Sequence, residues 1–247
     1  MFSVEGKMRR AEEFARHALE LLPETDLMAR GFATMTLGMA LRFSDQLPEA
    51  ERVLTEAVAI NRAAGDNHVT VIALCDLAFV QYVVGKVHQA HVTYQEALRL
   101  ADAYRHVSGG RMPVIGYVYV HLSTLMLEWN ELAESLRLAQ QGVELCQQWG
   151  WAELLVDSYM TLAITLSASE DFNRALEAIQ QARDSARSLS EWYLVKIVEP
   201  PEVIIHLKQG DLDFAARWLE RLENPANTTD QSYVPFDRVV RLRVKIA

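Results

Sequence analysis

The residues best suited to chemistry in this 247-residue sequence are few. His88 and His91 are three positions apart, which places two imidazole nitrogens on one face of a helix, as a metal site requires. No third ligand accompanies them, and the sequence lacks the Cys-x-x-Cys, His-Glu-x-x-His and Gly-x-Ser-x-Gly motifs. The acidic pair Glu170-Asp171 has no apolar enclosure that would raise a carboxyl pKa. We therefore predict that the chain is not an enzyme and that it holds no metal ion or cofactor.

The composition indicates a helical protein. Half of the residues are hydrophobic, and only 11 Gly and 7 Pro are available for turns, which is too few for many short strands. The 24 Lys and Arg against 33 Asp and Glu give a net charge of −9, which disfavours direct binding to nucleic acid. The sequence has no secretory signal and no apolar stretch long enough to cross a membrane, so we expect a cytoplasmic protein without a membrane segment. The two cysteines, Cys75 and Cys146, each lie in an apolar run and are predicted to be buried free thiols.

A repeated turn segment runs through the sequence. Each copy contains an apolar residue, here called the anchor, and the copies recur at a nearly constant interval, of which the second is slightly longer. The anchors are Leu47, Val87, Leu132, Phe172 and Leu212. A small residue follows each anchor by three positions, and another precedes it by nine positions in four of the five copies, so two helices can approach closely. The pattern predicts an all-α fold, a right-handed superhelix (α-solenoid) of antiparallel helix pairs with repeats of about 40 residues.

The helix boundaries follow from these anchors. The predicted pairs are 26–43/48–64, 67–84/88–105, 114–128/133–148, 152–168/173–188 and 191–209/213–223. A lone helix at 7–22 precedes these repeats (26–64, 67–105, 114–148, 152–188 and 191–223), and a further repeat begins at 236–247. Gly65, Gly109, Gly110 and Gly150 occur where second helices should end. Pro200 and Pro201 should kink or interrupt the helix at 191–209. We expect one solenoid domain over 1–247, as a piece of a longer chain.

The sequence also resembles a known family. The spacing is that of tetratricopeptide repeats, although about 34 residues is usual there. The segments 109–113, 127–132, 142–150 and 210–219 are similar to the helical sensor region of MalT-type regulators, which are large LuxR-family transcriptional activators. The resemblance implies an ATP-binding module before this region and a helix-turn-helix DNA-binding domain after it, but this sequence has no phosphate-loop motif. It implies a module that senses an inducer or binds partner proteins, and that reaches DNA only through other domains.

The first helices of the pairs should line a concave wall, the usual binding surface of a solenoid. Wall positions lie fifteen, twelve, eight and five positions before each anchor. The candidate ligand- or partner-binding residues there are Phe32, Met35, Met39, Arg42, Phe79, Tyr82, Tyr117, Thr124 and Asp157. This wall is mostly apolar, so something should cover it. A partner's peptide or helix, a second copy of the chain and tighter packing that makes the wall internal all remain open, as does a pocket for a small inducer.

A second candidate site surrounds the irregular loop at 105–113. Arg105, Arg111, Tyr119 and Trp129 combine guanidinium donors with flat aromatic faces, which suit a polar ligand or a carboxylate. In the alternative interpretation, Trp129 only fills a hairpin crossing. The favoured function is therefore a ligand-sensing or protein-interaction module of a MalT-type regulator. The alternative is a free-standing tetratricopeptide-like scaffold that docks a peptide or helix of another protein.

Overall fold

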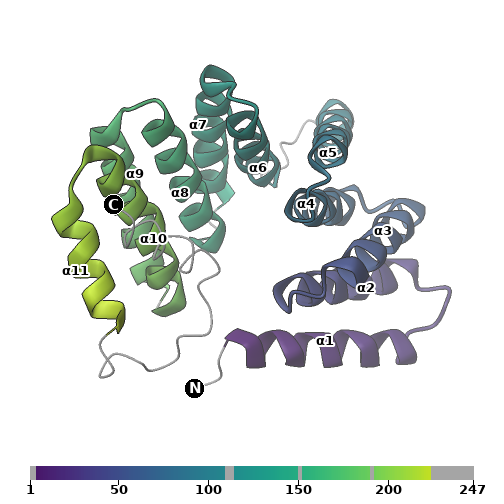
Figure 1. The fold of residues 1–247 in the computed structure, drawn as a ribbon. Coiled ribbons are helices and arrows are strands. Elements are labelled where there is room, and N and C mark those ends of the chain that lie inside the picture. The colour runs from purple at the N-terminus through teal and green to yellow at the C-terminus, as the bar shows by residue number, and fades with distance from the viewer. Residues whose placement is uncertain (1–3, 109–113, 150–151, 190–191, 224–247) are drawn as a thin grey trace. The chain divides into compact units, whose positions relative to one another are not determined.

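The computed structural model describes residues 4–108, 114–149, 152–189 and 192–223, and every regular element within these ranges is an α-helix (Figure 1). The helices are α1 (Val4–Leu21), α2 (Leu27–Phe43), α3 (Leu47–Ala63), α4 (Asn67–Val83), α5 (Val87–Ser108), α6 (Ile115–Glu128), α7 (Leu132–Trp149), α8 (Ala152–Ala168), α9 (Phe172–Ser188), α10 (Trp192–Gln209) and α11 (Leu212–Glu223). The prediction of an all-α helical-repeat fold is confirmed.

Most predicted helix boundaries lie within a residue or two of these, with two notable differences. Helix α5 continues to Ser108, into the segment expected to be a loop. Helix α10 runs through Pro200 and Pro201, so the expected interruption is wrong. The prolines cannot donate to the carbonyls four residues earlier. Side-chain contacts of Glu199 with Trp218 and of Glu202 with Arg183 tie this stretch to both neighbouring helices. Gly109, Gly110, Gly150 and the expected helix at 236–247 lie outside the described residues, and the single solenoid domain stays a prediction.

One turn geometry recurs before all five anchors. The residue two positions before each anchor has a positive φ, between 59° and 83°. These residues are Asp45, Gly85, Asn130, Glu170 and Gly210. The next amide then donates to the carbonyl five residues earlier, as from Lys86 to Gln81 (2.8 Å) and from Asp211 to His206 (2.9 Å). This bond ends the first helix in the same way each time and reverses the chain into the second.

Small residues at the helix crossings allow the close packing that the spacing predicts. The residue three positions after each anchor is buried in every pair: Ala50, Ala90, Ser135, Ala175 and Ala215. On the facing helix, Gly38 leaves no room for a larger residue, because a Cβ there would lie 2.6 Å from the side chain of Leu54. The anchors therefore set both the turn and the depth at which the two helices pack.

The chain divides into two compact units, Met1–Leu122 and Ser123–Ala247. In the first, α2 packs on α3, α4 packs on α5, α3 packs on α4, and α1 covers α2. In the second, α8 pairs with α9, α7 packs on α8, and α10 packs on both α8 and α9. Apolar side chains such as Val156, Leu166 and Ile179 form a core in this second unit. Trp218 of α11 packs in a separate cluster with Val203 of α10.

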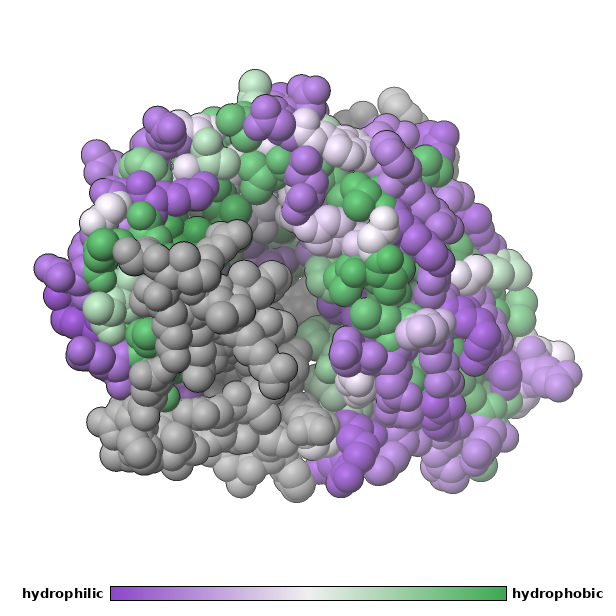
Figure 2. Space-filling view, in the orientation of Figure 1, coloured by the Kyte–Doolittle hydropathy of each residue, from purple (hydrophilic) through white to green (hydrophobic). Residues whose placement is uncertain are grey.

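The described surface mixes polar and apolar residues. In the face that Figure 2 shows, hydrophilic residues cover most of the described helices and hydrophobic residues gather in smaller patches. None of the described helices has the length and apolar character needed to cross a membrane.

Candidate functional site

A buried ion pair joins α2 to α4 in the first unit. The Nε of Arg42, in the last turn of α2, lies 3.3 Å from Oδ1 of Asp76 on α4. Only 12% of the Arg42 side chain and 2% of the Asp76 side chain are exposed. The guanidinium also lies over two aromatic rings, 4.1 Å from the centre of Phe43 and 4.7 Å from that of Phe79. The cation is therefore held by a carboxylate and by cation–π contacts in a largely dry environment.

Asp76 connects this pair to a third helix. Burial raises the pKa of its carboxyl above the ordinary value, although the Arg42 charge and a hydrogen bond donated by the Tyr117 hydroxyl act in the opposite direction. Tyr117 lies on α6. One carboxylate thus links α2, α4 and α6, the first helices of three successive repeats. A change at this carboxylate can alter how those three helices are held together.

A neutral histidine completes the site. The His121 ring makes edge-to-face contacts with Tyr117 (4.3 Å between ring centres) and Phe79 (5.3 Å), and it lies parallel to Tyr94 at 5.9 Å. Burial, together with the nearby Arg42 charge, lowers the pKa of His121 to about 3, so the imidazole is neutral near pH 7. We call Arg42, Asp76, Phe79, Tyr117 and His121 the Arg42 cluster.

The structure brings together three of the nine residues predicted on the wall: Arg42, Phe79 and Tyr117. In the same unit, Phe32 is exposed, Met39 and Tyr82 are half-buried, and Met35 is buried in the core. Thus Met35 offers no open surface to a ligand.

The remaining wall candidates, Thr124 and Asp157, are half-buried in the second unit. Burial and the nearby Asp157 charge raise the pKa of Cys146 to about 12. Cys75 and Cys146 are both buried and free, as the sequence predicts. Both are therefore protonated near pH 7, since burial also raises the pKa of Cys75.

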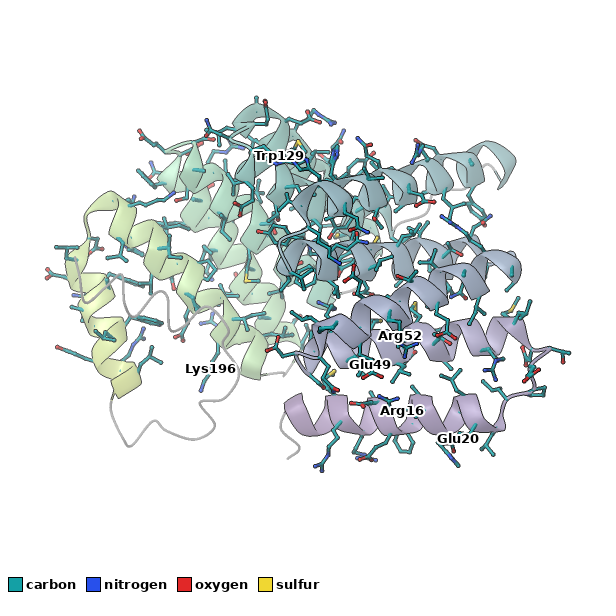
Figure 3. All side chains as sticks on the ribbon, turned by 45° about the vertical axis from the view of Figure 1, so that its right-hand side comes forward. Arg16, Glu20, Glu49, Arg52, Trp129 and Lys196 are labelled. Carbon is teal, nitrogen blue, oxygen red and sulfur yellow. The ribbon has the colours of Figure 1, made fainter. Side chains whose placement is uncertain are left out.

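The second predicted site is described only in part. Arg111 and the Arg105 side chain lie outside the described residues. Tyr119 is half-buried on α6, and Trp129 is half-buried at the turn after α6 (Figure 3). Whether these four side chains gather around one ligand stays a prediction.

The sequence prediction of wall residues missed Asp76 and His121 because it used only the positions fifteen, twelve, eight and five before each anchor. Both lie eleven positions before their anchors, Val87 and Leu132, next to the offset of twelve that selected Cys75 and Val120. An offset of eleven lies on the same helical face as offsets of fifteen and eight. For Asp76 the available signal was a lone acidic residue in the mostly apolar helix α4.

The described residues offer no group of three His, Cys, Asp or Glu side chains that could hold a metal ion. The Arg42 cluster combines a cation, a carboxylate, a phenol hydroxyl and aromatic faces. An anionic group could pair with Arg42 and a flat or apolar group could pack on the rings.

Comparisons with known proteins agree with this fold. The family model described as "MalT-like TPR region" matches residues 1–247. The HTH-type transcriptional regulator MalT of Yersinia enterocolitica is 24% identical over 222 residues, which make up 89% of this chain and 24% of that protein. The chain thus spans about a quarter of the length of this relative.

Two solved structures share the fold. A Rap protein complexed with Competence and Sporulation Factor superimposes with a TM-score of 0.69 and 15% identity, over 88% of this chain and 59% of that one. BtubC from P. vanneervenii gives a TM-score of 0.56 and 18% identity, over 76% of each chain. Since the family model covers the whole sequence and the helices repeat in the expected register, the chain belongs to the MalT-like TPR region family.

Proposed function

We propose that this chain is the non-catalytic, signal-sensing module of a cytoplasmic, LuxR-family transcriptional regulator of the MalT type. The observation that carries the proposal is the family match over the entire sequence, together with the MalT relative that covers 89% of the chain. Contact with DNA would be made by other domains of the regulator, in keeping with the net charge of −9 of this chain.

Effector recognition is assigned to the Arg42 cluster. A small effector with a carboxylate or phosphate group would compete with Asp76 for the Arg42 guanidinium. Loss of the Arg42 contact would raise the pKa of the Asp76 carboxyl further, because the Arg42 charge is one of the interactions that lower it. Loss of the Arg42–Asp76 contact would change how α2 and α4 are held, and binding would shift the population of repeat arrangements presented to the rest of the regulator.

The test uses native mass spectrometry of the purified chain with a pool of carboxylated and phosphorylated metabolites. We expect a retained compound whose affinity falls at least tenfold in the double variant Arg42→Met with Asp76→Leu, in which apolar side chains replace the ion pair. Arg52→Met is the matched control, since Arg52 is an exposed arginine on α3 (Figure 3). Equal binding by the double variant would reject the Arg42 cluster as the site, and no retained compound would reject small-molecule sensing.

The second candidate is a free-standing scaffold that docks a peptide or helix of a partner protein. It is favoured by the exposed side chains of Met28 and Phe32, one turn apart on α2. The Rap protein supports either candidate, because its structure holds Competence and Sporulation Factor on the same fold. The complete coding sequence distinguishes the two: an upstream phosphate-loop motif and a downstream helix-turn-helix favour the regulator, and a stop codon soon after Ala247 favours the scaffold.

A further inference from the structure

The carboxylate of Asp76 has fewer hydrogen bonds than its burial requires. The Tyr117 hydroxyl donates to this carboxylate, and Nε of Arg42 lies at ion-pair distance from Oδ1, at 3.3 Å. That contact is not a hydrogen bond, and Oδ1 accepts none from any residue that the structure describes. The Asp76 side chain is only 2% exposed, so solvent reaches this oxygen poorly. A buried carboxylate oxygen without a donor is unfavourable, and a ligand that carries a donor group would satisfy it.

Other ion pairs of the chain do form hydrogen bonds. In the second unit Arg183 donates a hydrogen bond to Glu202, and both side chains are more exposed than Asp76. At the surface of the first unit, Lys86 donates to both carboxylate oxygens of Glu51 (2.8 and 2.9 Å). The most deeply buried carboxylate of these three pairs is therefore the one with an unsatisfied oxygen.

The charges of the Arg42 cluster limit what a ligand can carry. Arg42 and Asp76 neutralise each other, and His121 is neutral near pH 7, so the cluster has no net charge. A ligand carboxylate that paired with Arg42 would leave the Asp76 carboxylate buried without its cation, which is strongly unfavourable. A positively charged group on the same ligand would remove this penalty, because it would take the place of Arg42 beside Asp76.

The distance between the two protein charges limits how far apart the charges of the ligand can be. Nε of Arg42 and Oδ1 of Asp76 are neighbours, 3.3 Å apart, so ligand groups that reach both must also lie side by side. In an α-amino acid a single carbon separates the ammonium from the carboxylate, which keeps the two groups adjacent. A longer amino acid such as γ-aminobutyrate would have to fold back on itself to make the same contacts.

Aromatic rings beside the ion pair offer a surface for the rest of the ligand. The centres of the Phe43 and Phe79 rings lie 4.1 Å and 4.7 Å from the Arg42 guanidinium. Phe43 is 38% exposed and Phe79 is half-buried, whereas Asp76 is buried, so the cluster is open to solvent on the side of Phe43. An apolar or aromatic side chain would pack on these rings.

We propose that the effector of the Arg42 cluster is a zwitterionic α-amino acid with an apolar or aromatic side chain. Its carboxylate pairs with Arg42, its ammonium donates to Oδ1 of Asp76, and its side chain packs on the Phe43 and Phe79 rings. The inference rests on the proposed effector site and narrows the ligand to one chemical class. Binding exchanges one ion pair for two and leaves the net charge of the buried cluster unchanged.

The first experiment measures binding to the parent chain by isothermal titration calorimetry, with L-leucine and L-phenylalanine as probes. Isocaproate and hydrocinnamate are the matched compounds that keep the carboxylate and lack the ammonium. Leucic acid and phenyllactic acid carry an uncharged hydroxyl donor in its place. We expect at least one amino acid to bind at least tenfold more tightly than both of its analogues. Equal binding by an analogue, or binding of neither amino acid, would overturn the proposal.

The same titrations separate this proposal from the effector site itself. If isocaproate or hydrocinnamate binds as tightly as its amino acid, and Arg42→Met with Asp76→Leu abolishes that binding, the site is retained and the amino-acid class is rejected. If the double variant binds every compound as the parent does, the site is rejected as well.

The second experiment changes the preference of the site. Asp76→Asn keeps the size and an acceptor for Tyr117 but removes the negative charge, so the affinity for the amino acid should fall at least tenfold. The affinity for isocaproate or hydrocinnamate should not fall, because Arg42 no longer has a competing carboxylate. Glu202→Gln, the same change at the ion pair of the second unit, is the control and should alter neither affinity. An amino-acid affinity that Asp76→Asn leaves unchanged would contradict the pairing of the ammonium with Asp76, and if this variant does not fold, the comparison of analogues on the parent chain decides.

Discussion

Both units bury neutral polar contacts at helix crossings, such as that of Thr93 with Gln81 in the first unit, but the first unit also buries a charged pair between its first helices. In the first unit, Arg42 and Asp76 carry opposite charges along the row of first helices. In the second, three neutral hydroxyls lie together where α6 crosses α7 and α8. Their oxygens are 3.1 Å apart for Ser123 and Ser135, 3.2 Å for Ser135 and Thr165, and 3.4 Å for Ser123 and Thr165.

This difference bears on the proposal that the Arg42 cluster is a recognition site. The hydroxyls satisfy one another, and Ser135 also donates to the carbonyl of Ser123 (2.9 Å), so the crossing needs no outside partner. Well-packed apolar residues of similar volume would stabilise the fold about as well as a buried ion pair does. The second unit has its own pair, Arg183 with Glu202, but both side chains are more exposed than Asp76. This contrast supports the proposal that the charges of the Arg42 cluster serve recognition.

The largest effect should come from removing the carboxylate that joins the three helices. Asp76→Ala leaves the Arg42 charge buried without its carboxylate and should lower the free energy of unfolding by about 3–5 kcal/mol, measured by urea denaturation. Glu202→Ala in the second unit is the matched change and should cost less, because Arg183 is more exposed to water than Arg42. Equal losses would remove the distinction between the two ion pairs.

A smaller effect concerns pH. The pKa of His121 is about 3 in the folded chain and near 6.5 when unfolded, so the unfolded state binds more protons below pH 6.5. The neutral His121 therefore favours the folded chain fully above pH 6.5, and this contribution to the free energy of unfolding is lost as the pH falls towards 3. The slope is up to roughly 1.4 kcal/mol per pH unit, or about 2 kcal/mol at pH 5.

The measurement compares urea denaturation of the parent chain and His121→Phe at pH 7, 6 and 5. The phenylalanine keeps the aromatic contacts but cannot take up a proton, so its stability should fall less on acidification. Asp76, whose raised pKa acts with the opposite sign, is present in both chains and cancels from the difference. Parallel pH profiles for the parent and His121→Phe would show that His121 is not held neutral by its surroundings.

Periodicity predicted the helices well and the site only in part. Anchors such as Leu47 and Val87 mark a local turn geometry that depends on few neighbours, and in all five turns the residue two positions before the anchor has a positive φ. The Arg42–Asp76 contact depends on two helices from different repeats, and neither residue alone indicates its partner. The two prolines of α10 show the opposite case, in which the local sequence gave a wrong prediction. Proline strongly disfavours a helix interior, but the contacts of the adjacent Glu199 and Glu202 with neighbouring helices outweigh this preference.

The smallest effect tests whether the hydroxyls of the second unit are only structural. Ser123→Ala should lower the free energy of unfolding by about 1 kcal/mol or less, measured by urea denaturation, because Ser135 keeps its contact with Thr165 and its bond to the residue 123 carbonyl. Alanine occupies the equivalent position in two other pairs, Ala78 and Ala163, and both are fully buried, so the smaller side chain fits this crossing. The companion variant is Thr165→Val, which keeps the volume but removes a hydroxyl that both serines contact. It should lower the free energy of unfolding by more than Ser123→Ala does. A loss for Ser123→Ala as large as that for Asp76→Ala would mean that neutral hydroxyls and buried charges play the same role, and the contrast between the two units would no longer point to a recognition site.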